Sequence, residues 1–178
     1  MTLPKDGPIP ISHRSKNFSP DPMKAATAQD IKQELKHLSH AELTELLQRL
    51  VRFKKENKEL LTYLLFEAHD EAAFVASVKA AMEEGMEGIR SGQVYLAKKT
   101  IRKVLRLASK YIRFAGSKSV EAELLMHFCV LLRDTGIALN KYPVLQNLYN
   151  QQKQKALAAI ESLHKDLQFE LMRNWNRL

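Results

Sequence analysis

Cysteine is almost missing from this chain, since Cys129 is the single cysteine among 178 residues. One cysteine cannot close an intramolecular disulfide or build a cysteine-rich zinc site, and in an apolar run this thiol is expected to be buried and inert. Long apolar runs are missing too, because no stretch approaches the roughly 18 to 20 residues that cross a bilayer. The N-terminal MTLPKDGPIP lacks the pattern of a secretory leader. These absences predict a soluble, cytoplasmic protein with no membrane partner.

Glycine and proline are scarce, with six residues each, which excludes collagen-like and low-complexity classes. Five of the six prolines fall at positions 4, 8, 10, 20 and 22, in a segment with few apolar side chains and no period. Proline removes backbone donors, and little apolar surface is present to offset the entropy of ordering. We therefore expect residues 1–26 to form a disordered, proline-rich tail.

From Thr27 onward the composition is dominated by Leu, Ala, Glu, Lys and Gln, which have high helix propensity. No alternating run of β-branched residues is present. The sequence therefore predicts an all-α fold in which residues 27–178 form a single domain. About seven helices joined by short links are expected to pair as antiparallel hairpins, in a helical bundle or a short stack.

Caps and glycines predict where these helices begin and end. Ser39 and Glu42 match the S-x-x-E capping box, Gly116 fits the left-handed position after a helix, and Pro143 fits a first turn. The predicted helices are about 28–38, one that starts after Ser39, 57–69, 71–88 capped by Asp70, 94–114, one capped by Ser119 that ends at Gly136, and 143–174. Two packing stripes are expected: Leu43, Leu46, Leu47, Leu50 and Val51 on the second helix, and Ala72, Val75, Val78 and Met82 on the fourth.

Charge placement is the strongest functional feature of the sequence. No Asp or Glu lies between Gly88 and Val120, and the local charge of +9 exceeds the +8 of the whole chain. The nine bases are Arg90, Lys98, Lys99, Arg102, Lys103, Arg106, Lys110, Arg113 and Lys118.

Six of these bases fall within an arc of roughly 100° on the predicted fifth helix. Like charges at this spacing repel one another, and an anionic partner would relieve the repulsion. Acidic residues elsewhere in the fold, such as Glu83, Glu84 and Glu87, would neutralise the arc equally well. We expect partner contacts from Lys99, Arg102, Lys103, Arg106, Lys110 and Arg113, opposite an apolar face made by Ala97, Ile101, Val104, Leu105, Ala108 and Ile112.

The stretch from Ala81 to Leu107 resembles one tetratricopeptide-type helical hairpin. Gly85 matches the small residue of the first helix, and the turn and second helix are matched by Gly92, Ala97, Ile101, Val104 and Leu105. The first-helix aromatic and the closing proline are missing, and no second copy follows at that period. The resemblance implies a scaffold that binds peptides or proteins.

A second resemblance lies in IKQELKHLSHAELTELLQRLVRFKKENKELLTYLL. This opening is similar to that of an uncharacterised family of small helical bacterial proteins, which implies no activity. It also resembles the helix-turn-helix of the SAP nucleic-acid module, although the glycine turn and the lysine after it are absent.

Candidates for metal binding and catalysis are few. Glu34 with His37, and Glu161 with His164, have the Glu-x-x-His spacing of di-iron bundles, for which Glu67 and Glu123 would be the nearest additional ligands. His127 in LLMHFCVLL is expected to be a core histidine with a hydrogen-bonded ring. No phosphate loop, nucleophile elbow or paired-acid signature is visible, so neither an enzyme nor a cofactor is predicted.

The predicted last helix carries a near-heptad apolar stripe, interrupted by NQQKQK. This stripe fits a long helix packed along the domain, and it would also serve a homodimer through the C-terminal helix. Exposure of Leu167, Leu171 and Trp175 would favour the dimer.

Together these features predict a non-enzymatic binding or adaptor protein that docks an acidic protein surface on a basic helix. Two alternatives stay open. One is binding of nucleic acid without sequence specificity, in which Tyr95 on the basic side would stack on a base. The other is a metal-dependent helical-bundle enzyme.

Overall fold

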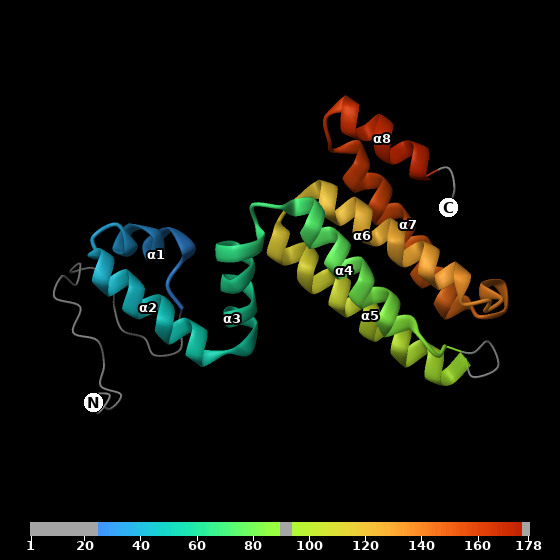
Figure 1. Ribbon diagram of the computed structural model, residues 1–178, viewed down its shortest axis with the longest axis horizontal. Helices are drawn as coiled ribbons and strands as arrows, with labels where there is room; N and C mark the ends of the chain where they lie inside the picture. Colours follow the sequence, from blue (N-terminus) through green and yellow to red (C-terminus); the bar gives the residue numbers. More distant parts are fainter. Residues whose placement is uncertain (1–24, 90–93, 176–178) are drawn as a thin grey trace. The chain divides into compact units, whose positions relative to one another are not determined.

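A computed structural model describes residues 25–89 and 94–175 of the chain, apart from the side chain of Asn174 (Figure 1). All regular structure in these two ranges is helical, which confirms the predicted all-α fold. The predicted tail, apart from Ala25 and Ala26, lies outside the described residues, as do Arg90 and Gly92. Eight α-helices are described: α1 (Ala28–Leu35), α2 (His40–Phe53), α3 (Lys55–Thr62), α4 (Glu71–Met86), α5 (Val94–Ala115), α6 (Lys118–Asp134), α7 (Pro143–Glu161) and α8 (Lys165–Trp175).

The chain divides into two compact units, residues 1–58 and 59–178, and the boundary falls within α3. The sequence predicted one domain from residue 27, and the uniform helix-forming composition gives no sign of this division. Nothing in the described part of the first unit is buried, so its helices share no core of their own. Leu47 and Leu50, from the predicted stripe of α2, are exposed.

Local capping explains where the helices of the first unit begin. The predicted capping box is confirmed, since the Ser39 amide donates to Glu42 Oε2 at 2.8 Å and the Glu42 amide donates to Ser39 Oγ at 3.3 Å. The third helix begins at Lys55 and not at Asn57. Asn57 instead donates its side-chain amide to the Leu50 carbonyl at 2.8 Å, which ties the start of α3 to the end of α2.

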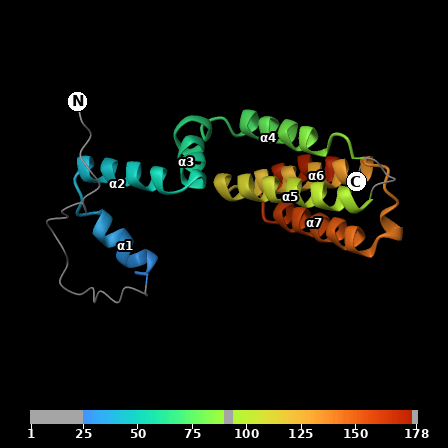
Figure 2. The same cartoon turned by 90° about the horizontal axis from the view of Figure 1, so that it is seen from below.

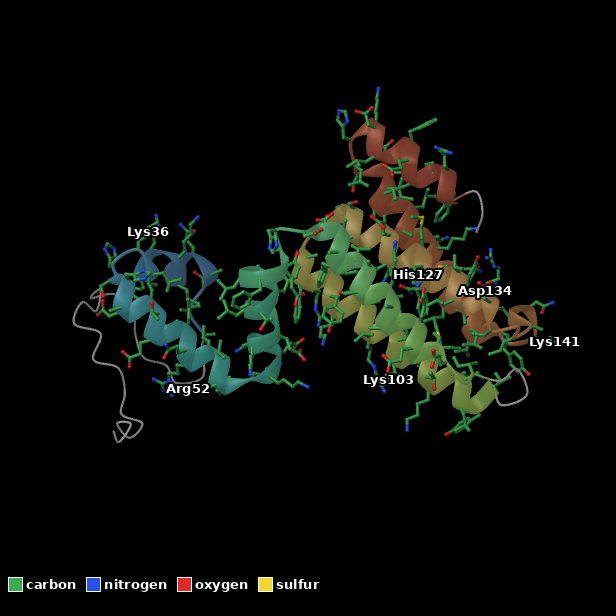
Figure 3. The ribbon with its side chains drawn as sticks, in the orientation of Figure 1. Lys36, Arg52, Lys103, His127, Asp134 and Lys141 are labelled. Atoms are coloured by element: carbon green, nitrogen blue, oxygen red, sulfur yellow. The ribbon has the colours of Figure 1, made fainter. Side chains whose placement is uncertain are left out.

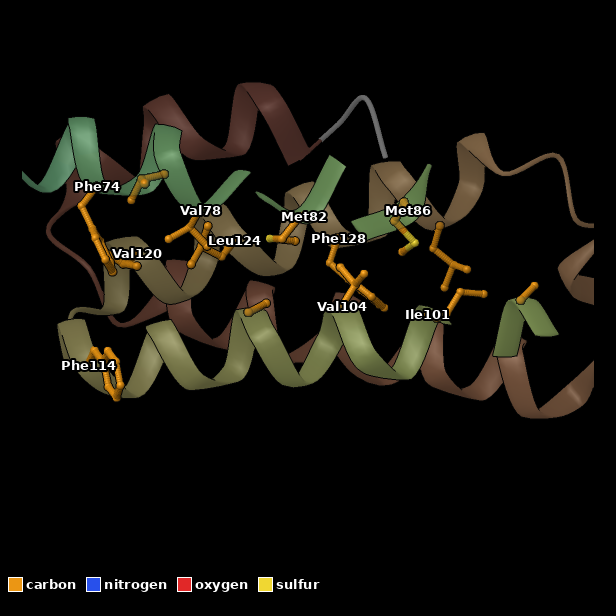
Figure 4. Close-up of a cluster of buried hydrophobic side chains, with 14 of the residues drawn as sticks. Phe74, Val78, Met82, Met86, Ile101, Val104, Phe114, Val120, Leu124 and Phe128 are labelled. Atoms are coloured by element: carbon orange, nitrogen blue, oxygen red, sulfur yellow. The ribbon is translucent and has the colours of Figure 1, made fainter. Parts of the chain in front are cut away.

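In the second unit, α6 is the central helix and packs against α4, α5, α7 and α8. Figure 2 shows α4 and α7 on opposite sides of the layer that holds α5 and α6. The apolar residues of α6 surround the helix, as expected for a helix buried on most sides. One row packs with α4 and α5 and consists of Val120, Leu124, Phe128 and Leu132. Figure 4 labels the first three of these. A second row packs with α7 and α8 and consists of Ala122, Leu125 and Met126.

The α4–α5 hairpin begins as predicted, because the Asp70 carboxylate accepts the Ala73 amide at 2.9 Å. Val75, Val78 and Met82 are buried, but Ala72 is exposed, which corrects the predicted stripe. Phe74, and not Ala72, is buried in the first turn of α4, because it lies four residues before Val78 and therefore on the same face of the helix. Before this hairpin, the predicted helix 57–69 changes into a π-helical turn, Tyr63–Glu67. That turn buries Tyr63 against Phe74, with ring centroids 4.5 Å apart.

The cap of α6 is Ser117 and not the predicted Ser119. Gly116 ends α5 with φ +62°, a left-handed conformation that glycine adopts at low cost. Ser117 is then extended, and its Oγ accepts the Val120 amide at 3.5 Å. The next helix therefore starts immediately, and Ser119 falls inside its first turn. Gly136, with φ +69°, follows the end of α6 as predicted.

The predicted long final helix is broken, because α7 ends at Glu161 and α8 begins at Lys165. Gln168 stabilises this corner by donating its side-chain amide to the carbonyls of Glu161 and Leu163, at 2.9 and 2.8 Å. The break lets Leu171 and Trp175 pack on the α6–α7 cluster. Leu171 is therefore used within the unit while Leu167 stays exposed, and the homodimer through the C-terminal helix stays a prediction.

Candidate functional site

The candidate site is the solvent-facing side of α5. This helix is amphipathic, and its opposite face is buried through Ala97, Ile101, Val104 and Ala108, as predicted. Leu105 and Ile112 are half-buried along its edge. Because α5 packs against both α4 and α6, the backbone beneath the basic side chains is held by the core.

Four of the six predicted partner-binding residues are exposed cations on this side. Figure 3 shows Lys103 extending from α5 away from the packed helices. No carboxylate of residues 25–89 or 94–175 lies within ion-pair distance of any of the four. We call this set the basic face, and its members are Lys99, Arg102, Lys103 and Arg106.

The other two predicted residues are engaged within the fold. Lys110 is half-buried, forms an ion pair with Glu59 at 3.2 Å, and lies 4.5 Å from the centroid of the Tyr111 ring. This lysine therefore fixes the α3 end of the unit to α5. Arg113 is exposed and also takes part in an interaction within the protein. The predicted six-residue site is thus reduced to four residues whose charges have no carboxylate partner among the described residues.

The acidic side chains of α4 that would have neutralised the arc do not pair with it in the described structure. Glu83 of α4 points to α6, where its Oε1 lies 3.1 Å from Nε2 of His127. One turn earlier, Lys79 of α4 forms an ion pair with Glu123 of α6 at 2.7 Å. Glu84 and Glu87 are exposed, and within the described residues neither pairs with the basic face.

His127 is the titratable group most affected by the α4–α6 contact. Burial is the largest effect and lowers its pKa, the Glu83 carboxylate raises it, the charge of Lys79 lowers it, and a hydrogen bond to the Lys79 backbone raises it. Nε2 is enclosed beside the Glu83 carboxylate, and the ring also hydrogen-bonds to the Lys79 backbone, in line with the predicted hydrogen-bonded ring. The residue faces Glu83 across a helix contact and does not lie in the apolar core.

The first turn of α5 adds apolar side chains to the basic face. Tyr95 is 86% exposed and Leu96 is 57% exposed. On a helical wheel Tyr95 lies within the arc of the cations, and Leu96 lies at its edge, about 60° from Lys99. The sequence analysis identified Tyr95 but not Leu96. Leu96 lies three residues before Lys99, and this helical spacing could have placed it beside the cations.

The residues proposed for metal binding do not assemble. No group of three or more His, Cys, Asp or Glu side chains within the described ranges could hold a metal ion. Glu34 and His37 belong to the first unit, His164 faces Asp166 at 3.4 Å, and Glu123 is ion-paired with Lys79. Cys129 is buried as expected, and burial raises the pKa of its thiol to about 12, which disfavours the reactive thiolate.

Comparisons of this chain with models of protein families, with curated proteins and with solved structures give no match. The similarity to a tetratricopeptide hairpin and to a helical bacterial family therefore stays a prediction. Among the described residues, no helix has the length and apolar character required to span a bilayer.

Proposed function

We propose that this chain is a non-enzymatic binding or adaptor protein that docks an acidic surface of a partner protein on the basic face of α5. The observation that supports the proposal is the set of four exposed cations without a carboxylate partner in the described structure. These charges repel one another on one side of a helix, and a multivalent anion would remove that repulsion. Arginine adds bidentate pairing with carboxylates.

Binding of nucleic acid without sequence specificity is the second candidate. It is favoured by the exposed ring of Tyr95 beside the cations, which offers a surface for base stacking. The same four cations would contact phosphates, and such binding weakens steeply with salt. The two candidates therefore use the same residues and differ in the partner.

Fluorescence anisotropy with a labelled acidic peptide, duplex DNA and single-stranded RNA, each across a salt series, tests both candidates. Arg102→Glu with Arg106→Glu should abolish binding of the preferred partner and leave the protein folded, because neither side chain forms an ion pair in the described structure. Lys155→Glu with Lys165→Glu is the matched control, since it makes the same charge change at exposed positions of α7 and α8. Equal binding by both double variants would contradict the proposal.

A further inference from the structure

We infer that the partner of α5 is an acidic amphipathic helix with apolar side chains at one end, and that Tyr95 and Leu96 bind that end. The inference rests on the proposed function, because it specifies the chemistry of the partner for the same basic face. It adds two residues to the interface and a direction along α5.

The exposed side of α5 has two parts in series. Tyr95 and Leu96 occupy its first turn, and the cations begin with Lys99, one turn later. From Tyr95 to Arg106 the helix advances about 16 Å at its usual rise per residue. The surface therefore has an apolar end and a cationic remainder, so a complementary partner has an apolar end followed by carboxylates.

The position of Tyr95 and Leu96 next to the cations indicates that they belong to the same binding surface. Single exposed apolar residues are normal on protein surfaces. Here two adjacent side chains are mostly exposed and continuous with cations that lack carboxylate partners among the described residues. Tyrosine and arginine are among the residue types most enriched at the positions that dominate binding energy in protein interfaces.

The spacing of the cations favours a helix as the docked element. Lys99, Arg102 and Arg106 repeat at intervals of three and four residues, which matches the turns of a second helix laid along α5. An extended peptide rises about twice as fast per residue and would pass the same cations with fewer carboxylates. A nucleic-acid strand would use the ring of Tyr95, but the aliphatic Leu96 offers no stacking surface.

The test uses the full-length protein and three labelled helical peptides. The first has two leucines at one end, followed by four glutamates at intervals of three and four residues. The second has the same composition with the leucines placed between the glutamates, and the third has serine in place of leucine. Wild type should bind the first peptide about tenfold more tightly than the other two, the usual size of a good apolar anchor. Duplex DNA is measured in parallel.

Tyr95→Ser with Leu96→Ser should remove this preference without changing the affinity for the serine peptide. Phe169→Ser on α8 removes an equally exposed apolar side chain and should leave all three affinities unchanged. Circular dichroism verifies that each variant is folded.

Three results would overturn the inference in different ways. Equal binding of all peptides by wild type, still lost in Arg102→Glu with Arg106→Glu, would leave the proposed function intact and remove the apolar end from it. Unchanged peptide binding in the charge variant would contradict the proposed function itself. Tighter binding of duplex DNA than of any peptide, with a steep salt dependence, would identify nucleic acid as the partner.

Discussion

Gly85 lies where α4 has no room for a side chain against α5. A Cβ atom at this position would lie 2.8 Å from Cγ2 of Val104, which is itself almost fully buried. Helix propensity alone predicts that alanine stabilises an interior helix position by about 1 kcal/mol relative to glycine. We expect the opposite sign for Gly85→Ala, a loss of about 1 to 3 kcal/mol, because Val104 has no room to move. Urea unfolding measures the difference.

The steric origin of this effect can be separated from a general change in α4. Val104→Ala removes the methyl group that meets the new Cβ, so the cost of Gly85→Ala should be much smaller in the Val104→Ala background. Ala80→Ser, at an exposed position of the same helix, should change stability by less than about 0.5 kcal/mol. Equal costs of Gly85→Ala in both backgrounds would show that the close contact is not the cause.

His127 should make stability depend on pH. Burial, as the largest effect, lowers its pKa in the folded protein below the ordinary value of about 6.5; the charge of Lys79 acts in the same direction, and Glu83 and a hydrogen bond to the Lys79 backbone act against it. As pH falls through 6.5, the unfolded chain takes up a proton that folded His127 does not, so its contribution to stability is lost. Urea midpoints at pH 7.5 and 5.5 should therefore differ more for wild type than for His127→Gln. Identical pH dependence of the two proteins would contradict the assignment.

At the scale of the element, features set by local sequence were predicted better than features set by long-range packing. Helix starts depend on residues close in sequence, through a capping hydrogen bond at Ser39 and Asp70 and through the fixed backbone angle of Pro143. All three residues lie at the helix starts that the sequence predicted. The exposed cations of α5 were also predictable, because a helix buried on one face directs the other to solvent. The ion pair between Lys110 and Glu59 was not, since these two residues, 51 positions apart, are brought together only in the folded second unit.

The break between α7 and α8 is a second feature that local sequence patterns do not predict. The apolar period continues through Leu163, Leu167 and Leu171, so periodicity alone predicts one helix. The turn allows Leu171 to be buried against the α6–α7 cluster. This long-range contact cannot be predicted from the local sequence pattern. Hydrogen bonds from Gln168 then satisfy carbonyls at the end of α7.

Leu171→Ala should therefore release α8 without unfolding the rest of the unit. Removing a buried leucine costs about 2 to 5 kcal/mol, and α8, the last described helix, has its main contacts with α6 and α7. Trp175, the one tryptophan of the chain, is half-buried with Lys153 Nζ 5.2 Å from its ring centroid. Its emission should shift to the red in Leu171→Ala at urea concentrations where the helical signal is unchanged. Leu167→Ala, at an exposed position, should cause no shift.

On the scale of the whole molecule, the core is distributed unevenly between the two units. All buried residues of the described structure lie at or beyond Tyr63, and α1, α2 and α3 bury none. The basic face lies on a helix of the well-packed unit, so its cations are held at fixed spacing. The first unit has apolar side chains on α2 but no core beneath them, and local opening there should cost little free energy.

Limited trypsin digestion tests this difference, because both units present exposed basic residues. Cleavage of a folded helix requires local opening, so its rate follows the free energy of that opening when reclosing is fast. Among the described helices, we expect the first cuts at Arg49, Arg52 and Lys54 at the end of α2, while Arg102 and Arg106 of α5 resist. Phe128→Leu weakens the core against which α5 packs, and it should speed cleavage in α5 without changing the rate in α2. Equal initial rates in α2 and α5 of wild type would contradict the lower free energy of local opening expected for the first unit.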